Sequence, residues 1–175
     1  MREDILSVLV SEEQLRQRVA ELGAQITRDY EGKNLVLVSV LKGSVTFMAD
    51  LMRAIDLPLR IDFMSVSSYG AGTKTSGVVK IVKDLDKPVV GKHVVLVEDI
   101  VDTGRTLSLL VERLKQRNPL SLEVVTLLDK PDRRVVDFKA DKSLFVIPDL
   151  FVIGYGLDYG EYYRNLPYIA EFEGE

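Results

Sequence analysis

The residues with the clearest chemical potential lie in one short stretch, 93–106 (HVVLVEDIVDTGRT). It begins as an apolar run, continues with three carboxylates, and ends in Thr-Gly-Arg-Thr at the start of a helical pattern. A glycine-containing turn that leads into a helix presents backbone N–H groups to an anion, and threonine hydroxyls add further donors. The stretch therefore predicts a cradle for a single phosphate group. Its residues are Thr103, Gly104, Arg105 and Thr106.

The three carboxylates beside this predicted cradle are Glu98, Asp99 and Asp102. Acids repel a phosphate unless they face another group, such as ribose hydroxyls, a divalent cation or a proton to be removed. A sugar phosphate as substrate suits each of these roles. The simpler interpretation is that Asp99 and Asp102 only cap the following helix. Capping does not explain why further acids stand at the end of an otherwise apolar strand.

Composition argues against several other chemistries. Cysteine is absent and His93 is the only histidine, which argues against thiol nucleophiles, thiolate or histidine-rich metal sites and Ser-His-Asp triads. The net charge of −4, from 27 acidic and 23 basic residues, argues against a nucleic-acid-binding surface. No apolar run approaches the ~18 residues of a membrane span, and acids stand where a signal peptide carries Lys or Arg. We expect a cytoplasmic protein that binds neither nucleic acid nor membrane.

The elements that must position these residues follow from the hydrophobic pattern. The length of 175 residues matches one domain. Apolar residues at helical spacing predict helices over Ser11 to Tyr30, Ser44 to Ile55 and Arg105 to Gln116, the first with a Ser11/Gln14 capping box. Short apolar runs predict strands over Asn34 to Leu41, Leu59 to Ser67, Val78 to Val82, His93 to Glu98, Leu122 to Leu128 and Leu150 to Ile153. The alternation predicts an α/β fold with a mainly parallel sheet flanked by helices, and ligands bind such sheets beyond the carboxyl ends of the strands.

The segment VVLVEDIVDTGRT resembles the phosphoribosyl pyrophosphate (PRPP) binding motif of the type I phosphoribosyltransferases, and its ED-I-VDTG form resembles their hypoxanthine-guanine branch. Four further motifs resemble this family in the expected order: Leu41-Lys42-Gly43, Ser68-Tyr69, Leu128-Asp129-Lys130-Pro131 and the tail PDLFVIGYGLDYGEYYRNLP. The resemblance covers about residues 35–167. It implies one phosphoribosyltransferase domain over 1–175, with a lid at 68–77 and a small hood formed by the N-terminal segment and the C-terminal tail.

The resemblance also implies a reaction. It is the magnesium-dependent transfer of the 5-phosphoribosyl group from PRPP to hypoxanthine, and also to guanine, which gives IMP or GMP and pyrophosphate. By this resemblance Asp102 is the general base or acid that exchanges a proton with the purine nitrogen at position 7. Glu98 and Asp99 hold the ribose hydroxyls and Mg²⁺, and Asp158 reaches a magnesium ion as well.

Two further groups of residues obtain roles from the resemblance. Lys42 and Gly43 hold the leaving pyrophosphate through a non-proline cis peptide, and Arg164 is its second contact. Ser68 and Tyr69 cap the site when the polar loop at 68–77 folds over it, which protects the reaction from water.

The purine side is implied in the same way. Lys130 donates to the 6-oxo group of the purine and Phe151 stacks on the base. The backbone at Val152 and the region of Asp158 line the purine edge. Taken alone, each of these signals has a plain structural interpretation, because Lys130 fits a solvated turn and Phe151 fits a core position.

Two other functions stay open at this point. An RNA-binding regulator can be built on the same fold, although the net charge and the tail with Lys130 and Phe151 argue against it. A xanthine-preferring enzyme of the same class is the second alternative. The resemblance further implies a homodimer or a homotetramer.

Overall fold

The structure is a computed structural model that describes residues 5–68 and 79–173. The helices within these ranges are α1 (Glu12–Asp29), α2 (Val45–Ala54), α3 (Arg105–Lys115) and the short 3-10 helix η1 (Pro131–Arg133). The three predicted helices are confirmed, and so is the capping box of α1: the Gln14 N–H donates to Ser11 Oγ at 3.1 Å, and the Ser11 N–H donates to Gln14 Oε1 at 2.9 Å. No helix of the described residues is both long and apolar enough to cross a membrane.

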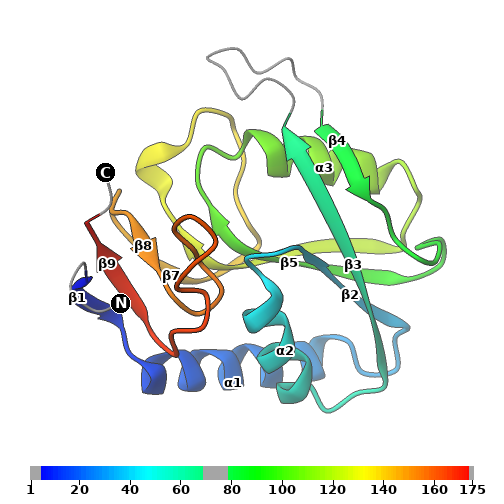
Figure 1. The fold of residues 1–175 in the computed structure, drawn as a ribbon. Helices are drawn as coiled ribbons and strands as arrows, with labels where there is room; N and C mark the ends of the chain where they lie inside the picture. Colours follow the sequence, from blue (N-terminus) through cyan, green and yellow to red (C-terminus); the bar gives the residue numbers. More distant parts are fainter. Residues whose placement is uncertain (1–4, 69–78, 174–175) are drawn as a thin grey trace.

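The main sheet has six strands in the order β4-β3-β2-β5-β6-β7 (Figure 1). Their bounds are β2 Leu35–Val40, β3 Leu59–Ser68, β4 Val79–Lys83, β5 His93–Val101, β6 Ser121–Asp129 and β7 Lys142–Val146. Every neighbouring pair is parallel except β3 and β4, which pair antiparallel. The carboxyl ends of β2, β5 and β6 therefore meet at one edge of the sheet, as the α/β prediction requires.

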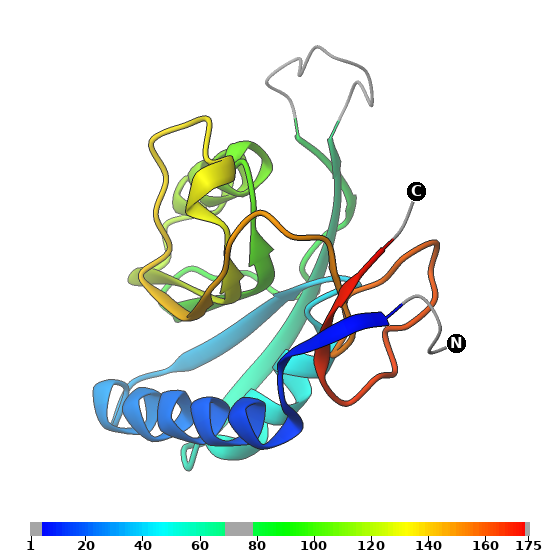
Figure 2. The same cartoon turned by 90° about the vertical axis from the view of Figure 1, so that its left-hand side faces the viewer.

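Helices cover both faces of this sheet, with α1 and α2 on one face and α3 on the other (Figures 1 and 2). All six residues of β2 are buried, which confirms a strand enclosed on both faces. Side chains alternate along β5, so Val95 and Val97 join the core under α1 and α2, while Val94 and Leu96 join the core under α3.

Both ends of the chain build a second, smaller sheet (Figure 1). It consists of β1 (Ile5–Val10), β9 (Ile169–Phe172) and β8 (Val152–Ile153), all antiparallel, in the order β1-β9-β8. This sheet is the small hood that the resemblance implies. The tail between β8 and β9 leads from it to the turn after β2, where Gly156 lies against the backbone of Gly43.

Three details of the strand prediction were wrong. Strand β5 does not end at Glu98 but continues to Val101, because the residues after Glu98 still pair with β6. The run at 150–153 is not a strand of the main sheet, since only Val152–Ile153 is extended and it pairs with β9. The outermost strand beside β6 is instead β7. The sequence analysis missed it because this half-exposed strand has only a short apolar run.

An ion pair fastens the loop after β4 to the segment after α3. Arg117 donates to both oxygens of Asp84 through its terminal nitrogens Nη1 and Nη2, at 2.8 and 2.9 Å, and this contact lowers the pKa of the Asp84 carboxyl. A lowered folded-state pKa stabilises the fold above the usual carboxyl range, and this stabilisation is lost as the pH falls through that range. We expect Asp84→Asn to lower the free energy of unfolding near pH 7 by less than about 1 kcal/mol, because the pair is partly exposed.

Urea unfolding of both proteins near pH 7 and at about pH 3 checks this. The difference between wild type and variant should shrink at the lower pH. The exposed Asp56 supplies the matched control, Asp56→Asn. An equal difference at both pH values would contradict the assignment.

Candidate active site

The residues of the predicted phosphate cradle lie at the start of α3. Gly104 has φ of +85°, a conformation that glycine adopts without strain, and it precedes the first helical residue, Arg105. Thr103, Gly104 and Thr106 line a cavity of about 180 Å³, which Glu98 borders from β5. The N-terminal N–H groups of α3 have no partners within the helix, so an anion of phosphate size can accept from them.

Glu98 and Asp99 lie next to each other at the end of β5, and their surroundings differ. Glu98 borders the cradle on the α3 side. Asp99 lies on the α2 side, and a Cβ atom added at Gly43 would come within 1.8 Å of its Oδ2 atom. Burial and the neighbouring charge of Asp99 raise the pKa of the Glu98 carboxyl. A cation beside this pair would relieve the repulsion between the two carboxylates.

The turn after β2 brings Lys42 and Gly43 to the same edge. The peptide bond between Leu41 and Lys42 is cis, which is the geometry that the resemblance implies for this turn. Lys42 Nζ points to the C-terminal tail and donates to Glu161 Oε2 at 2.7 Å. Gly43 is enclosed by Asp99 on one side and by Gly156 on the other, so that three distant segments meet at a residue without a side chain.

Asp102 is linked to Lys130 through a chain of alternating charges. Arg133 Nε donates to Asp102 Oδ1 at 2.9 Å, and Arg133 Nη1 lies 3.6 Å from Asp149 Oδ2. Lys130 Nζ lies 3.9 Å from the other oxygen of Asp149. Asp102 and Asp149 raise the pKa of the Arg133 guanidinium. Two of the side chains that the resemblance assigns to the purine, Asp102 and Lys130, are therefore joined by Arg133 and Asp149, which the sequence analysis did not single out.

The loop that carries Asp102 is supported from behind by the segment after β6. Arg134 Nε donates to the Asp102 carbonyl at 3.2 Å, and its guanidinium also binds Asp129 and the Phe138 carbonyl. The Lys130 N–H donates to the Val101 carbonyl at 2.9 Å. Lys130 is only 7% exposed, so the interpretation as a solvated turn residue is wrong. These contacts fix the end of β5 against the end of β6.

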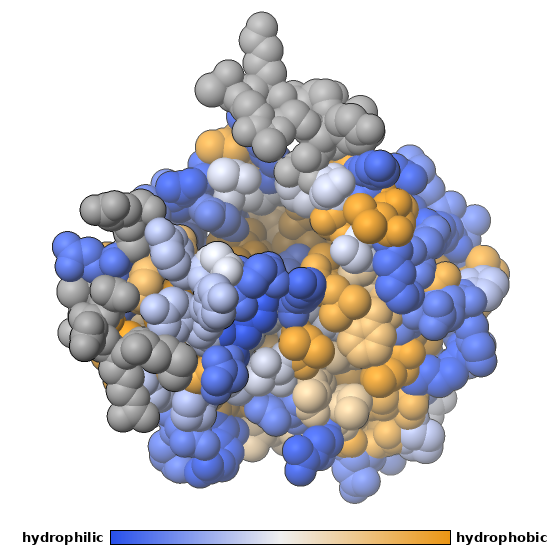
Figure 3. Space-filling model, viewed as in Figure 1, coloured by the Kyte–Doolittle hydropathy of each residue, from blue (hydrophilic) through white to orange (hydrophobic). Residues whose placement is uncertain are grey.

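Two of the predicted purine-side residues, Phe151 and Val152, lie just before β8 and on it. Phe151 is 49% exposed and contacts Tyr159 edge to face, with 5.8 Å between the ring centroids. The core interpretation of Phe151 is therefore wrong, and its ring is accessible for stacking. Val152 is buried within β8, next to it. In the space-filling view, this side of the molecule is hollowed near its centre, with hydrophobic residues at depth and hydrophilic residues on part of the rim (Figure 3).

Arg164 anchors the tail against the site. Its Nη1 atom donates to the Gly156 carbonyl at 2.7 Å, and its Nη2 atom lies 3.1 Å from Glu161 Oε1 and 3.4 Å from Asp158 Oδ2. Its Nε atom is buried and has no hydrogen-bond partner among the described residues. Arg164 and Lys42 thus both contact Glu161, a residue that the sequence analysis missed because no spacing in the chain connects it to Lys42.

The predicted magnesium ligands fall into two places. Glu98 and Asp99 are adjacent at the end of β5, whereas Asp158 contacts Arg164 and the Glu161 N–H in the tail. Within residues 5–68 and 79–173, no three histidine, cysteine or carboxylate side chains form a group that could hold a metal ion. Glu98 and Asp99 still suit Mg²⁺ as a pair, because Mg²⁺ prefers oxygen ligands and takes the remainder from water and substrate phosphates.

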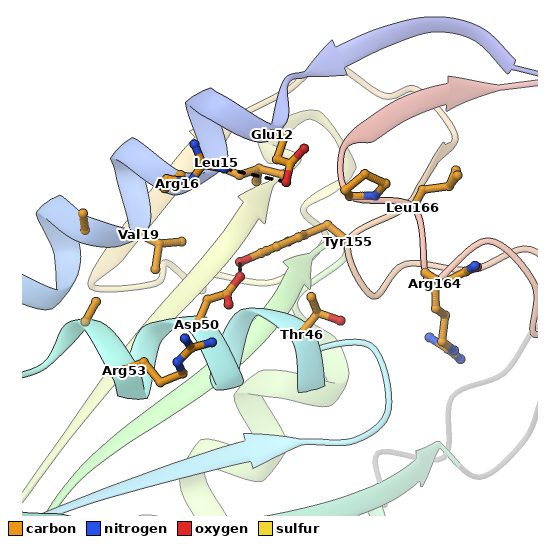
Figure 4. A pocket seen from close by; sticks show the side chains of 14 residues that line it. Glu12, Leu15, Arg16, Val19, Thr46, Asp50, Arg53, Tyr155, Arg164 and Leu166 are labelled. Atoms are coloured by element: carbon orange, nitrogen blue, oxygen red, sulfur yellow. Dashed lines mark hydrogen bonds and ion pairs between the residues drawn. The ribbon is translucent and has the colours of Figure 1, made fainter.

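A larger cavity, of about 630 Å³, lies between α1, α2 and the tail (Figure 4). Tyr155 reaches from the tail across this cavity and donates to Asp50 Oδ2 at 2.5 Å, while Arg164 points away from that contact. Burial raises the pKa of the Tyr155 hydroxyl. The cavity contains none of the carboxylates of β5, so we place the chemistry at the smaller cavity. The predicted lid, Ser68 and Tyr69 with the loop to Gly77, lies outside the residues whose side chains the structure describes.

Comparison with known proteins identifies the family and the fold of the chain. The model of the phosphoribosyl transferase domain family matches residues 9–160. The hypoxanthine-guanine phosphoribosyltransferase of Bacillus subtilis is 54% identical over 97% of this chain and 94% of its own length. A crystal structure of a hypoxanthine phosphoribosyltransferase from Staphylococcus aureus superimposes with a TM-score of 0.96, at 53% identity, and covers 99% of this chain and 94% of that one.

Other relatives are longer proteins. The bifunctional protein TilS/HprT of Listeria monocytogenes is 53% identical over the whole chain, which spans 27% of the length of that relative. The sequence match nevertheless runs over all 175 residues of this chain. The chain belongs to the phosphoribosyl transferase domain family and, within it, to the hypoxanthine-guanine phosphoribosyltransferases.

Proposed function

We propose that the protein transfers the 5-phosphoribosyl group from PRPP to hypoxanthine, and also to guanine, and releases pyrophosphate. The observation that carries this proposal is that an anion cradle, a carboxylate and a buried lysine meet in one contact network at the carboxyl ends of β5 and β6. In this proposal a sugar phosphate with a second anionic end extends from the cradle to Lys42. The 6-oxopurine binds through Asp102 and Lys130.

The residues divide the reaction between them. The cradle formed by residues 103–106 holds the 5-phosphate, and Lys42 with Arg164 holds the departing pyrophosphate. As the purine nitrogen at position 9 attacks the anomeric carbon, the bond to pyrophosphate breaks, and Asp102 takes the proton from the nitrogen at position 7. Lys130 donates to the 6-oxo group, which favours 6-oxopurines over adenine.

We further propose that Mg²⁺ is required. When bound, the ion would neutralise pyrophosphate oxygens as the leaving group departs. Glu98 and Asp99 would hold it, directly or through water, together with the ribose hydroxyls. Asp158 lies beside Arg164, where it could hold a second ion at the pyrophosphate end. The same proposal includes assembly as a homodimer or homotetramer, and closure of Ser68 and Tyr69 over the bound substrates.

Initial rates with hypoxanthine, guanine, xanthine and adenine, each with PRPP and with or without Mg²⁺, test the function directly. We expect turnover with hypoxanthine and guanine, little with adenine, and none when Mg²⁺ is chelated. Highest turnover with xanthine would move the assignment to a xanthine-preferring enzyme. Retention on RNA at physiological salt without any purine turnover would overturn the proposal in favour of a regulator.

The contact between Lys130 and the purine predicts a separate effect. We expect Lys130→Met to raise KM for hypoxanthine about tenfold, because a hydrogen bond from a charged donor to the 6-oxo group is lost. KM for PRPP should change by less than about twofold, since Lys130 is not part of the phosphate cradle. The exposed Lys139 provides the matched control, Lys139→Met. An unchanged KM for hypoxanthine would remove Lys130 from purine recognition.

A further inference from the structure

Glu161 forms ion pairs with the two cationic side chains, Lys42 and Arg164, that the proposed function assigns to pyrophosphate. Its Oε2 atom accepts from Lys42 Nζ at 2.7 Å, and its Oε1 atom accepts from Arg164 Nη2 at 3.1 Å. Lys42 follows β2 and Arg164 lies in the tail, so a single carboxylate bridges the two segments that border the pyrophosphate end of the site. A carboxylate with two oxygens on two cations makes the same kind of contact as a phosphate oxygen pair.

The backbone around Glu161 holds the carboxylate in this place. Glu161 has φ of +74° and Tyr163 has φ of +77°, a left-handed conformation that is unfavourable for residues with side chains. The Glu161 N–H donates to Asp158 Oδ2 at 2.9 Å, and paired hydrogen bonds between Tyr159 and Tyr162 close the turn. The hydrogen bonds of this turn stabilise two residues in an unfavourable backbone conformation. Such conformations are concentrated at functional sites.

The ion pair is nevertheless placed where an incoming anion can displace it. The side chains of Lys42 and Glu161 are 67% and 61% exposed, and exposed ion pairs exchange easily with solvent or with a competing ion. Lys42 and Arg164 lower the pKa of the Glu161 carboxyl, as expected for a carboxylate that contacts two cations. Pyrophosphate carries more charge and more acceptor oxygens than one carboxylate, so it can take both cations from Glu161.

We propose that Glu161 is an internal placeholder for the leaving pyrophosphate, which competes with it for Lys42 and Arg164 and so promotes its release. This inference rests on the proposed function, since that function assigns these cations to pyrophosphate. Glu161 then affects the reaction only through Lys42 and Arg164, without contact with the reacting atoms.

Glu161→Gln tests the inference, because glutamine keeps the size of the side chain and removes its charge. We expect the inhibition constant of pyrophosphate against PRPP to fall roughly threefold to tenfold, since two exposed ion pairs no longer compete. KM for hypoxanthine should stay within about twofold, because the purine lies at the other end of the site. The control is Glu31→Gln, an exposed glutamate just beyond α1. An unchanged or a weaker affinity for pyrophosphate in Glu161→Gln would overturn the inference.

A second comparison separates competition from a general change in charge. In a Lys42→Gln background, Glu161→Gln should improve pyrophosphate binding less than it does in the wild type, because one of the two pairs is already absent. Calorimetric titration with pyrophosphate makes this comparison for variants that turn over slowly. Equal gains in both backgrounds would overturn the placeholder role. Absence of PRPP-dependent turnover in the wild type would instead overturn the proposed function.

Discussion

Replacing Asp102 by asparagine should lower the turnover number by about 10²-fold or more and leave PRPP affinity within about twofold. Asparagine has nearly the same shape, and its amide oxygen can still accept the Arg133 Nε–H that now bonds to Asp102 Oδ1 at 2.9 Å. Arg134 holds the backbone carbonyl of residue 102 independently of the side chain. The loop and the cradle should therefore keep their geometry, while the amide cannot accept a proton from the purine ring.

The test requires both the turnover number and the PRPP affinity of the variant. Initial rates at saturating hypoxanthine and PRPP give the turnover number, and calorimetric titration gives the PRPP affinity. Asp132→Asn is the matched control, because Asp132 is an exposed acid on the neighbouring helix η1. Turnover close to that of the wild type would exclude Asp102 as the group that moves the proton. A parallel loss of PRPP binding would show that residue 102 acts through the cradle instead.

The parts of the site that the sequence predicted are those whose residues are contiguous. The apolar run of β2 and the first half of β5 are buried on both faces, so their pattern has only one structural solution. The cradle lies between the end of β5 and the start of α3. Its position at the carboxyl ends of the strands is therefore determined by the position of β5. The capping box of α1 is equally local, because Ser11 and Gln14 are three residues apart.

The parts that the sequence did not predict depend on contacts between distant segments. Lys42 and Glu161 are 119 residues apart, and Asp102 and Arg133 are 31 residues apart. Surface acids and bases are frequent in this chain, so composition does not indicate which of them pair. The same limitation applies to β7, because an edge strand needs only one good partner and carries a weaker apolar pattern than a central strand.

The distant segments are joined most closely at Gly43. The turn after β2, the end of β5 and the tail all meet there. The Gly43 carbonyl leaves no room for a Cβ atom at Gly156, and the Asp99 carboxylate leaves none at Gly43. Each segment brings a different part of the chemistry, namely Lys42, Asp99 and Arg164. The distances between the pyrophosphate contacts and the carboxylates are thus set by packing around one glycine.

A single methyl group at Gly43 should consequently have a large effect. The Cβ atom of Gly43→Ala would lie 1.8 Å from Asp99 Oδ2 and 2.8 Å from its Cγ atom, so the Asp99 carboxylate must turn away or the turn must move. Misplacement of catalytic groups by about 1 Å can cost about 10²-fold in rate. We expect kcat/KM for PRPP to fall by about that factor, with a smaller loss of stability of about 1–3 kcal/mol, typical of overpacking.

A second glycine separates the effect on the site from the effect on the fold. Gly91 has φ of +74°, and a Cβ atom added there would have no described neighbour within 4 Å. Gly91→Ala should therefore cost about 1 kcal/mol of stability through its backbone alone and leave kcat/KM unchanged. Steady-state rates and urea unfolding of both variants make the comparison. If Gly43→Ala loses activity only in proportion to the fraction unfolded, or retains full activity, then the packing at Gly43 does not set the geometry of the pyrophosphate end.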